Sequence, residues 1–412
     1  MIGTKYVPVT QAMVKAAFKS VESKRGSAGI DNESIKDFEQ NLEDNLYKIW
    51  NRMASGSYFP PAVKEVEILK EDGKKRKLGI PTVGDRVAQT VVKMFIEPRF
   101  EAIFSPSSYG YRPKRNCHQA LAQVRQNCWQ SDWVIDLDIK GFFDNIDHEL
   151  LMQSIDKHIP EKWVKMYIRR WIETPIVKVN GETAYREGKG TPQGGVISPL
   201  LANVFLHYVL DKWMEINYPS IKFVRYADDV IVHCPTKEIA EEVLKAIKER
   251  MHQCKLELHP EKTKIVYCKD SNRNKGDDNN IQFNFLGYSF QPRESKSIRG
   301  IFISFDCAIS KVKQSKIIAA IRSIKLQKAT EATIKEIAEV LNPKIQGWLN
   351  YFGKFRRFEM RWVFYYLNER LAHWVHNRYK SLNWHQSFEW LRRQIKLTPT
   401  MFVHWKAGFI GV

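Results

Sequence analysis

The sequence predicts an α+β protein whose body mixes helices and strands and continues into a basic, mostly helical region. Strand-like apolar runs recur between residues 63 and 305 and are separated by helical stretches. Beyond about residue 305 helical spacing dominates, with expected interruptions at the Asn-Pro of 342–343 and the Thr-Pro of 398–399. The composition, 43% hydrophobic and 27% charged, is typical of a globular protein rather than a disordered one.

The elements follow from local patterns, taken in chain order. In the first third we expect helices within 10–60, a hairpin of strands 63–69 and 78–81 with a basic tip at 70–77, helices at 86–97 and 118–127, and a strand at 133–139. Further on we expect a Gly/Pro-rich loop at 188–199, a long apolar helix at 200–213, two strands at 223–226 and 230–233, a polar insertion at 270–280, and short strands to about 305.

Positive charge is concentrated in the last part of the chain. The whole chain carries 65 Lys and Arg against 46 Asp and Glu, a formal charge of +19. Residues 296–412 account for +14 and the first 295 residues for +5, and six of the twelve tryptophans also lie in 296–412. Positive charge interleaved with aromatic rings favours a nucleic-acid partner. An ordinary helical domain with a solvated basic face is the alternative.

Neither a membrane nor an oxidising compartment is indicated. No apolar run approaches the roughly 18 residues that a membrane-spanning helix needs. The start of the chain lacks the apolar core of a signal peptide. The six cysteines are scattered without a C-x-x-C pair, which argues against zinc fingers and a disulfide framework. We therefore expect a cytoplasmic protein with no membrane partner.

Carboxylates stand out in two strand-like segments. Two hydrophobic strands meet at the adjacent pair Asp228 and Asp229. In 133–139 the period of two puts Asp136 and Asp138 on one face, opposite the apolar side chains. If these segments are neighbours, three or four carboxylates converge, and such hard oxygen ligands suit Mg²⁺. Two ions there would serve a polymerase or a hydrolytic nuclease equally, and an Asp-Asp turn can also be mere solvated surface.

Eight short motifs follow one another along the chain. They are KLGIP with DR, then YGYRP, LDIKGFFD from residue 137, GTPQGGVISPL from 190, YADD from 226, LHPEKTK from 258, FLGY from 285 and IQGWLNYFG from 345. In this order they resemble the reverse transcriptase/maturase proteins of bacterial group II introns: the first two resemble the fingers blocks, the next five the palm blocks and the last the maturase, or thumb, segment. The likeness runs from about residue 24 to about residue 405.

This resemblance implies a right-hand polymerase fold and an RNA-directed DNA polymerase. It places fingers at 1–115 (with part of 145–190), a palm at 116–300, a helical thumb or maturase region at 301–380, and a candidate short DNA-binding remnant at 381–412. No Cys pair follows residue 307, so we expect no zinc-bearing H-N-H endonuclease. The implied partners are dNTPs, group II intron RNA, an RNA template with a DNA or RNA primer, and a DNA target, in the cytoplasm and, when on DNA, at the nucleoid.

The resemblance also implies the metal site. Asp138, Asp228 and Asp229 match the family's three metal-binding aspartates. The pattern selects Asp138 over its same-face neighbour Asp136, a choice that strand periodicity leaves open. The resemblance also implies that Ile139, the residue after Asp138, contacts both the metal and the dNTP. The implied cofactor is two Mg²⁺ ions, for which Mn²⁺ is a possible substitute.

Nucleotide contacts are implied on the same basis. Phe143 matches an aromatic steric gate that would collide with a ribonucleotide 2′-hydroxyl, and a core phenylalanine is the alternative. Gln193, in the Pro-Gln-Gly turn, matches a residue that lines the nucleotide pocket. Arg76 and Lys77, at the basic fingertip, are placed to neutralise the triphosphate.

The remaining candidates rest on weaker matches. Arg86 and Arg112 are expected to contact template or nucleotide. Lys262 lies near the position of a lysine proposed to protonate pyrophosphate, and Lys264 competes for that role. Tyr288, in the Leu-Gly-Tyr segment, resembles the grip on the primer end.

Other functions remain open from the sequence. The chain is also compatible with an RNA-binding splicing factor whose polymerase site is vestigial, with a free-standing reverse transcriptase used in DNA repair or phage defence, and with an RNA-dependent RNA polymerase. The intact acidic motifs argue against the vestigial site.

Overall fold

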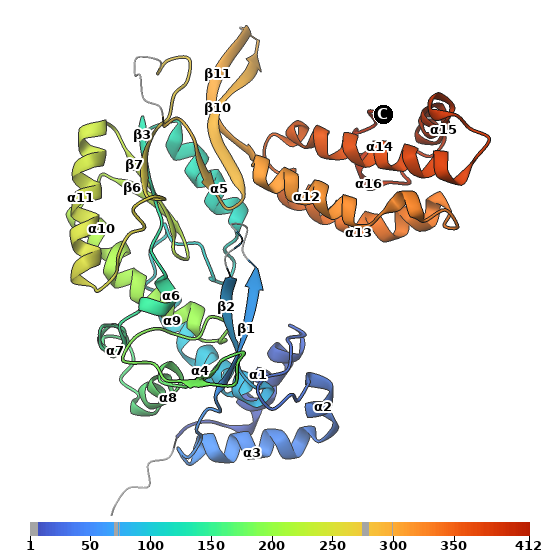
Figure 1. Ribbon diagram of the computed structural model, residues 1–412. Coiled ribbons are helices and arrows are strands. Elements are labelled where there is room, and N and C mark those ends of the chain that lie inside the picture. Colours follow the sequence, from blue (N-terminus) through green and yellow to red (C-terminus); the bar gives the residue numbers. More distant parts are fainter. Residues whose placement is uncertain (1–6, 70–72, 74, 274–279, 299) are drawn as a thin grey trace, which may run out of the picture. The chain divides into compact units, whose positions relative to one another are not determined.

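The computed structural model describes residues 7–69, 73, 75–273, 280–298 and 300–412 (Figure 1). It forms two compact units, the body unit (1–120 and 135–265) and the appendage unit (121–134 and 266–412). Residues 70–72 and 74 of the expected fingertip, and part of the expected insertion at 270–280, lie outside the described residues. No helix in the described ranges is long and apolar enough to cross a membrane.

The body unit combines helices with two small sheets. Its helices are α1 Gln11–Glu22, α2 Ile35–Gln40, α3 Leu42–Ala54, α4 Val83–Glu101, the start of α5 Cys117–Cys128, α6 Phe142–Asn145, α7 His148–Asp156, α8 Lys162–Ile172, α9 Ser198–Leu206, the π-helix η1 His207–Asp211, α10 Lys212–Asn217 and α11 Lys237–Gln253. Its strands are β1 Val63–Leu69, β2 Lys75–Ile80, β3 Trp133–Leu137, β4 Ile176–Val177, β5 Thr183–Ala184, β6 Lys222–Tyr226, β7 Asp229–Cys234 and β8 Lys264–Tyr267, of which β3 and β8 run across the unit boundary in the chain.

The first sheet contains the predicted basic hairpin. Its strand order is β2-β1-β4-β5, with β1 and β2 antiparallel and β1 and β4 parallel. The predicted strand 63–69 is confirmed as β1. The second strand begins earlier than the expected residue 78, because the ladder continues to the pair Leu69↔Lys75.

The second sheet brings the acidic segments together. Its order is β6-β7-β3-β8, so the hairpin β6–β7 lies beside β3, which carries Asp136 and is followed directly by Asp138. Figure 1 shows α10 and α11 along one side of this sheet. The strands predicted at 133–139, 223–226 and 230–233 are thereby confirmed, within a residue or two of their ends.

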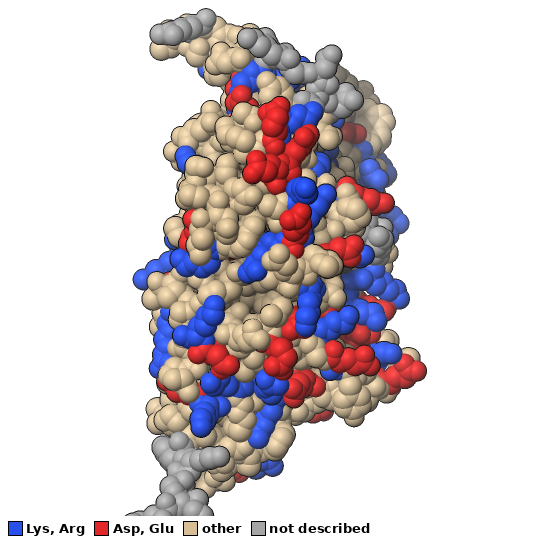
Figure 2. Space-filling view, turned by 90° about the vertical axis from the view of Figure 1, so that its left-hand side faces the viewer, with Lys and Arg blue, Asp and Glu red and all other residues tan. Residues whose placement is uncertain are grey.

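Charges on the face shown in Figure 2 are mixed rather than segregated. Lys and Arg side chains are interspersed with Asp and Glu over most of that face. This mixture agrees with the small net charge of +5 in the first 295 residues.

The appendage unit joins a three-stranded sheet to a helical bundle. The sheet has the order β11-β10-β9, from β9 Phe283–Phe285, β10 Tyr288–Ser297 and β11 Gly300–Ile309. The helices are α12 Lys311–Ser323, the 3₁₀ turn η2 Leu326–Lys328, α13 Ile334–Phe352, the 3₁₀ turn η3 Arg357–Met360, α14 Arg361–Arg378, α15 Trp384–Leu397 and α16 Val403–Lys406. One apolar core runs through this bundle, and it includes Leu391 and Trp405 from the end of the chain.

The expected interruption at 342–343 is wrong, because α13 passes through Pro343 without a break. Proline removes one helical hydrogen bond and normally ends or kinks a helix. Here the buried stripe that includes Leu341 and Ile345 packs into the bundle core. The Asn342 side chain donates a hydrogen bond to the Met401 carbonyl at 2.9 Å and accepts one from the backbone N–H of residue 403 at 3.0 Å. Tertiary packing therefore overrides the local signal.

Candidate active site

The acidic pair lies at the tip of the β6–β7 hairpin. The ladder closes at the pair Tyr226↔Asp229, which leaves Ala227 and Asp228 as a two-residue turn. Ala227 has a φ of 58°, a left-handed conformation that costs a non-glycine residue roughly 1–2 kcal/mol. A Cβ at Gly110 would lie 2.3 Å from the Ala227 nitrogen, so only glycine allows this backbone approach. The YGYRP loop therefore packs directly on the acidic turn.

Four carboxylates influence one another at this place. Burial, together with the carboxylates of Asp228, Asp136 and Asp138, raises the pKa of Asp229 to about 7. Burial likewise raises the pKa of Asp136 to about 7 and that of Asp228 above its usual range. The Lys262 ammonium lies 3.1 Å from a carboxylate oxygen of Asp138. The convergence predicted from the two strands is therefore present.

The donor set fits a divalent cation. Within the described part of the chain, no three Asp, Glu, His or Cys side chains already share a metal-coordinating geometry. Carboxylates that raise one another's pKa repel, and a cation between them removes that repulsion. Oxygen-only ligands are what Mg²⁺ prefers. Asp138, Asp228 and Asp229 are therefore suited to hold such an ion, with Asp136 on the same strand face as Asp138.

A fully buried ion pair supports the acidic turn. The Arg225 guanidinium donates two hydrogen bonds to the Asp211 carboxylate, at 2.7 and 2.6 Å, and both side chains are fully buried. The same guanidinium donates to the Asn203 side-chain oxygen at 2.9 Å and to the Ala227 carbonyl at 3.1 Å. Asn203 in turn donates to the Gly110 carbonyl at 2.8 Å. One network thus holds both the left-handed turn residue and the loop that packs on it.

Asp211 ends the π-helix η1, a rare element that often occurs near functional sites. Burial by itself raises the pKa of Asp211, but the Arg225 guanidinium and His207 outweigh burial and hold that pKa below its usual range. The carboxylate is therefore charged and paired. Arg225 stands next to the acidic pair in the sequence, but its charge is paired with Asp211.

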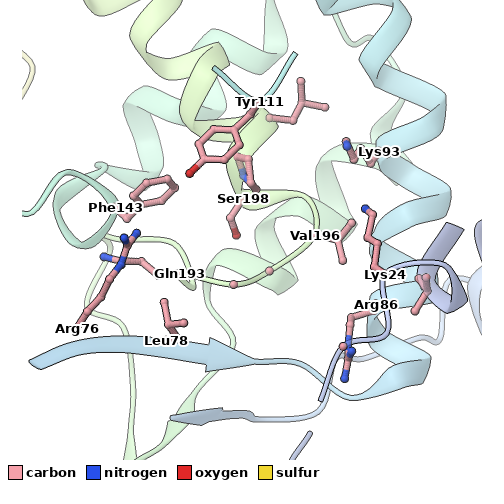
Figure 3. Close-up of a pocket in the computed structure, with 16 residues that line it drawn as sticks. Lys24, Arg76, Leu78, Arg86, Lys93, Tyr111, Phe143, Gln193, Val196 and Ser198 are labelled. Atoms are coloured by element: carbon pink, nitrogen blue, oxygen red, sulfur yellow. The ribbon is translucent and has the colours of Figure 1, made fainter. Parts of the chain in front are cut away.

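A cavity of about 530 Å³ opens in the body unit, and several predicted nucleotide contacts line it (Figure 3). Arg76, Phe143 and Gln193 lie at one end together with Tyr111. The Arg76 guanidinium donates a hydrogen bond to the Gln193 side-chain oxygen at 3.0 Å, and the Gln193 amide donates to Asp144 at 3.4 Å. The structure therefore brings Arg76, Phe143 and Gln193 together, although Arg76 and Gln193 are 117 positions apart in the sequence.

The other end of the cavity is cationic. Lys24, Lys93 and the largely buried Arg86 line it, and Figure 3 shows them across the cavity from Phe143. Burial and the nearby Lys93 lower the pKa of Lys24. Glu97 offsets part of this charge through an ion pair with Lys93 at 3.3 Å. The cavity therefore joins a polar, aromatic end to a positively charged one.

Strand β2 and the Pro-Gln-Gly turn pack against each other through two glycines, Gly79 and Gly194. The Gly79 N–H donates to the Gln193 carbonyl at 2.7 Å. Gly194 has a φ of 123°, and a Cβ there would lie 2.5 Å from the Gly79 carbonyl oxygen. Glycine is required at residue 194 by both the conformation and the approach. This contact fixes Gln193 opposite the strand that carries Arg76.

Alternation along β2 separates the two predicted triphosphate contacts. Arg76 lines the cavity, whereas Lys77 pairs with Glu65 at 3.5 Å and Lys75 pairs with Glu67 at 2.6 Å. Lys77 is not among the described side chains that line the cavity. A triphosphate in the cavity would therefore meet Arg76 first.

Two further candidates are used within the protein. The Arg112 side chain is 5% exposed, makes a two-pronged ion pair with Glu101 at 3.0–3.1 Å, and donates to the Ser105 and Ser108 carbonyls at 2.7 and 2.9 Å. These bonds brace the loop that contacts the acidic turn. In the appendage unit, the Tyr288 ring is fully buried and its hydroxyl donates to the Tyr351 carbonyl. Both residues occupy structural positions in this state of the protein.

The other candidates keep positions compatible with their predicted roles. Arg86 lines the cavity while its guanidinium donates to the carbonyls of Pro81, at 3.1 Å, and Ser27. Ile139 is buried and forms an isolated bridge with Leu258 next to the carboxylate strand. Lys264 lies close enough to lower the pKa of Asp136, whereas Lys262 contacts Asp138.

Several residues of the site were not predicted from the sequence. Tyr111 lines the cavity in a left-handed conformation (φ 57°), and burial, Asp228 and Asp229 raise its pKa. Its motif, YGYRP, was visible, but its position between cavity and acidic turn was not. Lys24 and Lys93 are ordinary helix-associated lysines until the fold brings them to one cavity.

Two family models match separate parts of the chain. Residues 68–290 match the family described as "Reverse transcriptase (RNA-dependent DNA polymerase)", and residues 314–394 match "Group II intron, maturase-specific domain". The group II intron-encoded protein LtrA of Lactococcus lactis subsp. cremoris is 27% identical over 86% of this chain and 70% of its own. Protein YkfC of Escherichia coli is 30% identical over 69% of this chain and 81% of its own.

Among solved structures, a telomerase from Candida albicans in complex with a fragment of telomeric RNA aligns with a TM-score of 0.48 at 10% identity, over 91% of this chain and 68% of that one. The family matches confirm the predicted resemblance, the α+β right-hand polymerase fold and the enzyme class. Members of this family use divalent metal ions and act on nucleic-acid templates. The chain belongs to the reverse transcriptase (RNA-dependent DNA polymerase) family and carries a group II intron maturase-specific domain.

Proposed function

We propose that the chain extends a primer with dNTPs on an RNA template, with two Mg²⁺ ions held by Asp138, Asp228 and Asp229 and Mn²⁺ as a possible substitute. The observation that carries this assignment is the cavity of the body unit, where Arg76, Phe143 and Gln193 meet beside Tyr111, a side chain close enough to Asp228 and Asp229 for them to raise its pKa. When bound, such ions would activate the primer 3′-hydroxyl and stabilise the pyrophosphate leaving group.

The chain's own residues would bind and orient the nucleotide. The Arg76 guanidinium would bind the triphosphate. Its hydrogen bond to Gln193 fixes both side chains on the same side of the cavity. Phe143 is 7% exposed and lines the cavity, which supports a gate against the ribonucleotide 2′-hydroxyl. Lys262, beside Asp138, is the better placed of the two lysines to donate a proton to pyrophosphate, since Lys264 acts on Asp136.

The cationic end of the cavity supports a template contact. Arg86 is joined there by Lys24 and Lys93, which would face the phosphates of the strand that pairs with the incoming nucleotide. In this assignment the helices and hairpin before residue 115, with part of 145–190, act as fingers and the carboxylate-bearing sheet acts as the palm.

We also propose that the appendage unit binds group II intron RNA and assists splicing and mobility at a DNA target. The maturase-specific match at 314–394 and the charge of +14 over 296–412 support this role. Helices α12–α14 correspond to the proposed thumb. Residues 381–412, expected as a separate remnant, contribute Leu391 and Trp405 to the same apolar core.

The test is primer extension on an RNA template with dNTPs and Mg²⁺. We expect Asp228→Ala to abolish extension while the fold is kept, because the substitution removes a carboxylate from a repelling cluster. Asp44→Ala, an exposed carboxylate on α3, is the matched control and should extend like the unsubstituted protein. Extension that survives Asp228→Ala would refute the metal assignment, and intron splicing without any extension would favour a splicing factor with a vestigial site.

A further inference from the structure

The appendage unit has two neighbouring hollows on its helical bundle. One, of about 360 Å³, lies between α13 and α16 and is lined by Asn350, Arg357 and Lys406 among others. The second, of about 250 Å³, lies between the start of α14 and residues 408–411 and is lined by Arg361, Trp362 and Tyr365 among others. Arg357 connects them, because its guanidinium lies 5.8 Å from the centre of the Phe409 ring, which lines the second hollow.

Apart from contacts with aromatic rings, the cations of these hollows have no partner among the described residues. Among the described residues, Arg357, Arg361 and Lys406 make no ion pair with a carboxylate and no side-chain hydrogen bond. The two hollows have no acidic side chain in their described lining. In the body unit, by contrast, Arg99 and Arg112 are both paired with glutamates. Three neighbouring unpaired cations provide a site for a polyanion.

The aromatic rings beside these cations are exposed. Trp362 is 58% exposed and Tyr365 is 48% exposed, although both are large and neighbour a well-packed core. The Arg361 guanidinium lies 5.3 Å from the centre of the Trp362 ring. Exposed rings next to arginines are the features on which proteins stack unpaired bases, whereas a continuous duplex does not present base faces to them.

We propose that this surface, formed by Arg357, Arg361, Trp362, Tyr365 and Lys406, binds unpaired nucleotides of an RNA loop. Bases stack on the two exposed rings, and the flanking phosphates contact the three cations. The inference rests on the proposed binding of intron RNA by this unit and assigns that binding to one surface and to one kind of RNA element.

The test compares the binding of two RNAs by the full-length protein. One is a hairpin with a large unpaired loop, and the other is a fully paired duplex of the same length, both measured by fluorescence anisotropy at fixed salt. For Trp362→Ala/Tyr365→Ala we expect affinity for the loop RNA to fall roughly tenfold or more, with little change for the duplex. Trp384→Ala, which removes an exposed tryptophan of the same unit on α15, is the matched control and should bind both RNAs normally.

A second measurement addresses the phosphates without touching the rings. In Arg361→Gln/Lys406→Gln the slope of log affinity against log salt for the loop RNA should become shallower by about 1.4, since each lost cation removes about 0.7. Unchanged loop binding in both double variants, or an equal loss for duplex and loop, would overturn the surface assignment. If the unsubstituted protein bound neither RNA, the proposed RNA-binding function itself would fail, which separates the two hypotheses.

Discussion

The buried pair of Arg225 and Asp211 offers the sharpest test of how the acidic turn is held. In Asp211→Asn the guanidinium loses its counter-charge while it stays fully buried, and the two hydrogen bonds of 2.6 and 2.7 Å lose their charged acceptor. Breaking a buried ion pair from one side costs about 3–5 kcal/mol, because the remaining charge is uncompensated. We therefore expect that loss in the free energy of unfolding of the body unit.

The same network predicts a separation of stability from activity. In Arg225→Met/Asp211→Leu both charges are removed, and apolar side chains of similar volume replace them, so most of the lost stability should return. Activity should not return, because the Ala227 carbonyl and the Asn203 side chain both lose the donor that positions them. Primer extension should thus show a reduced kcat in the double variant at near-normal stability.

Urea unfolding followed by tryptophan fluorescence measures the stability, and single-nucleotide extension measures kcat and KM. Lys15→Ala, which breaks an exposed ion pair of 3.2 Å with Glu43, is the control and should change neither unfolding nor kcat measurably. The reasoning would be refuted if Asp211→Asn unfolded like the unsubstituted protein, or if the double variant recovered full kcat.

Three further outcomes can be measured. Phe143→Ala should raise ribonucleotide incorporation relative to dNTP incorporation in competition assays, and an unchanged ratio would identify a mere core residue. Arg76→Ala should raise KM for dNTPs about tenfold or more, as expected for a lost charged contact worth roughly 1.5–3 kcal/mol, whereas Lys77→Ala should change it little because that side chain pairs with Glu65. Burial lowers the pKa of His404 to about 3 from 6.5, so the unfolded chain binds the proton first and stability falls as pH drops below 6.5. This contribution reaches about 2 kcal/mol at pH 5, and His404→Phe should flatten that pH dependence of the unfolding midpoint, whereas an unchanged slope would contradict it.

Local patterns predicted most elements that position the site. Strict alternation in 133–139 was enough to place Asp136 and Asp138 on one face, and the paired apolar strands around Asp228 predicted the hairpin. Both depend on interactions between near neighbours in the chain. By contrast, no pattern of neighbouring residues predicted that Lys24 and Lys93 line the same cavity.

Other features escaped prediction because packing decides them. The face of β2 that carries Arg76 rather than Lys77 depends on the ladder with β1 and on the contact of Gly79 with the Gln193 carbonyl. Helix α13 continues through Pro343 because contacts with the rest of the bundle hold its neighbours in place, among them the hydrogen bond from Asn342 to the Met401 carbonyl. Asp211 lies at the end of a long apolar helical stretch. No pattern in the sequence indicates that it forms an ion pair with Arg225, the arginine of strand β6.

The acidic turn breaks two local rules together, and the surrounding contacts explain why it persists. Adjacent like charges favour separation, and Ala227 occupies a conformation that disfavours a side chain. Gly110, the buried Arg225 and Asn203 hold the turn through backbone contacts and hydrogen bonds that do not involve the repelling carboxylates. Burial and this repulsion therefore raise the pKa values of Asp228 and Asp229, and the turn does not relax. Such a rigid, repelling set of oxygens gains most from a divalent cation, because binding removes the repulsion without the cost of reorganising the backbone.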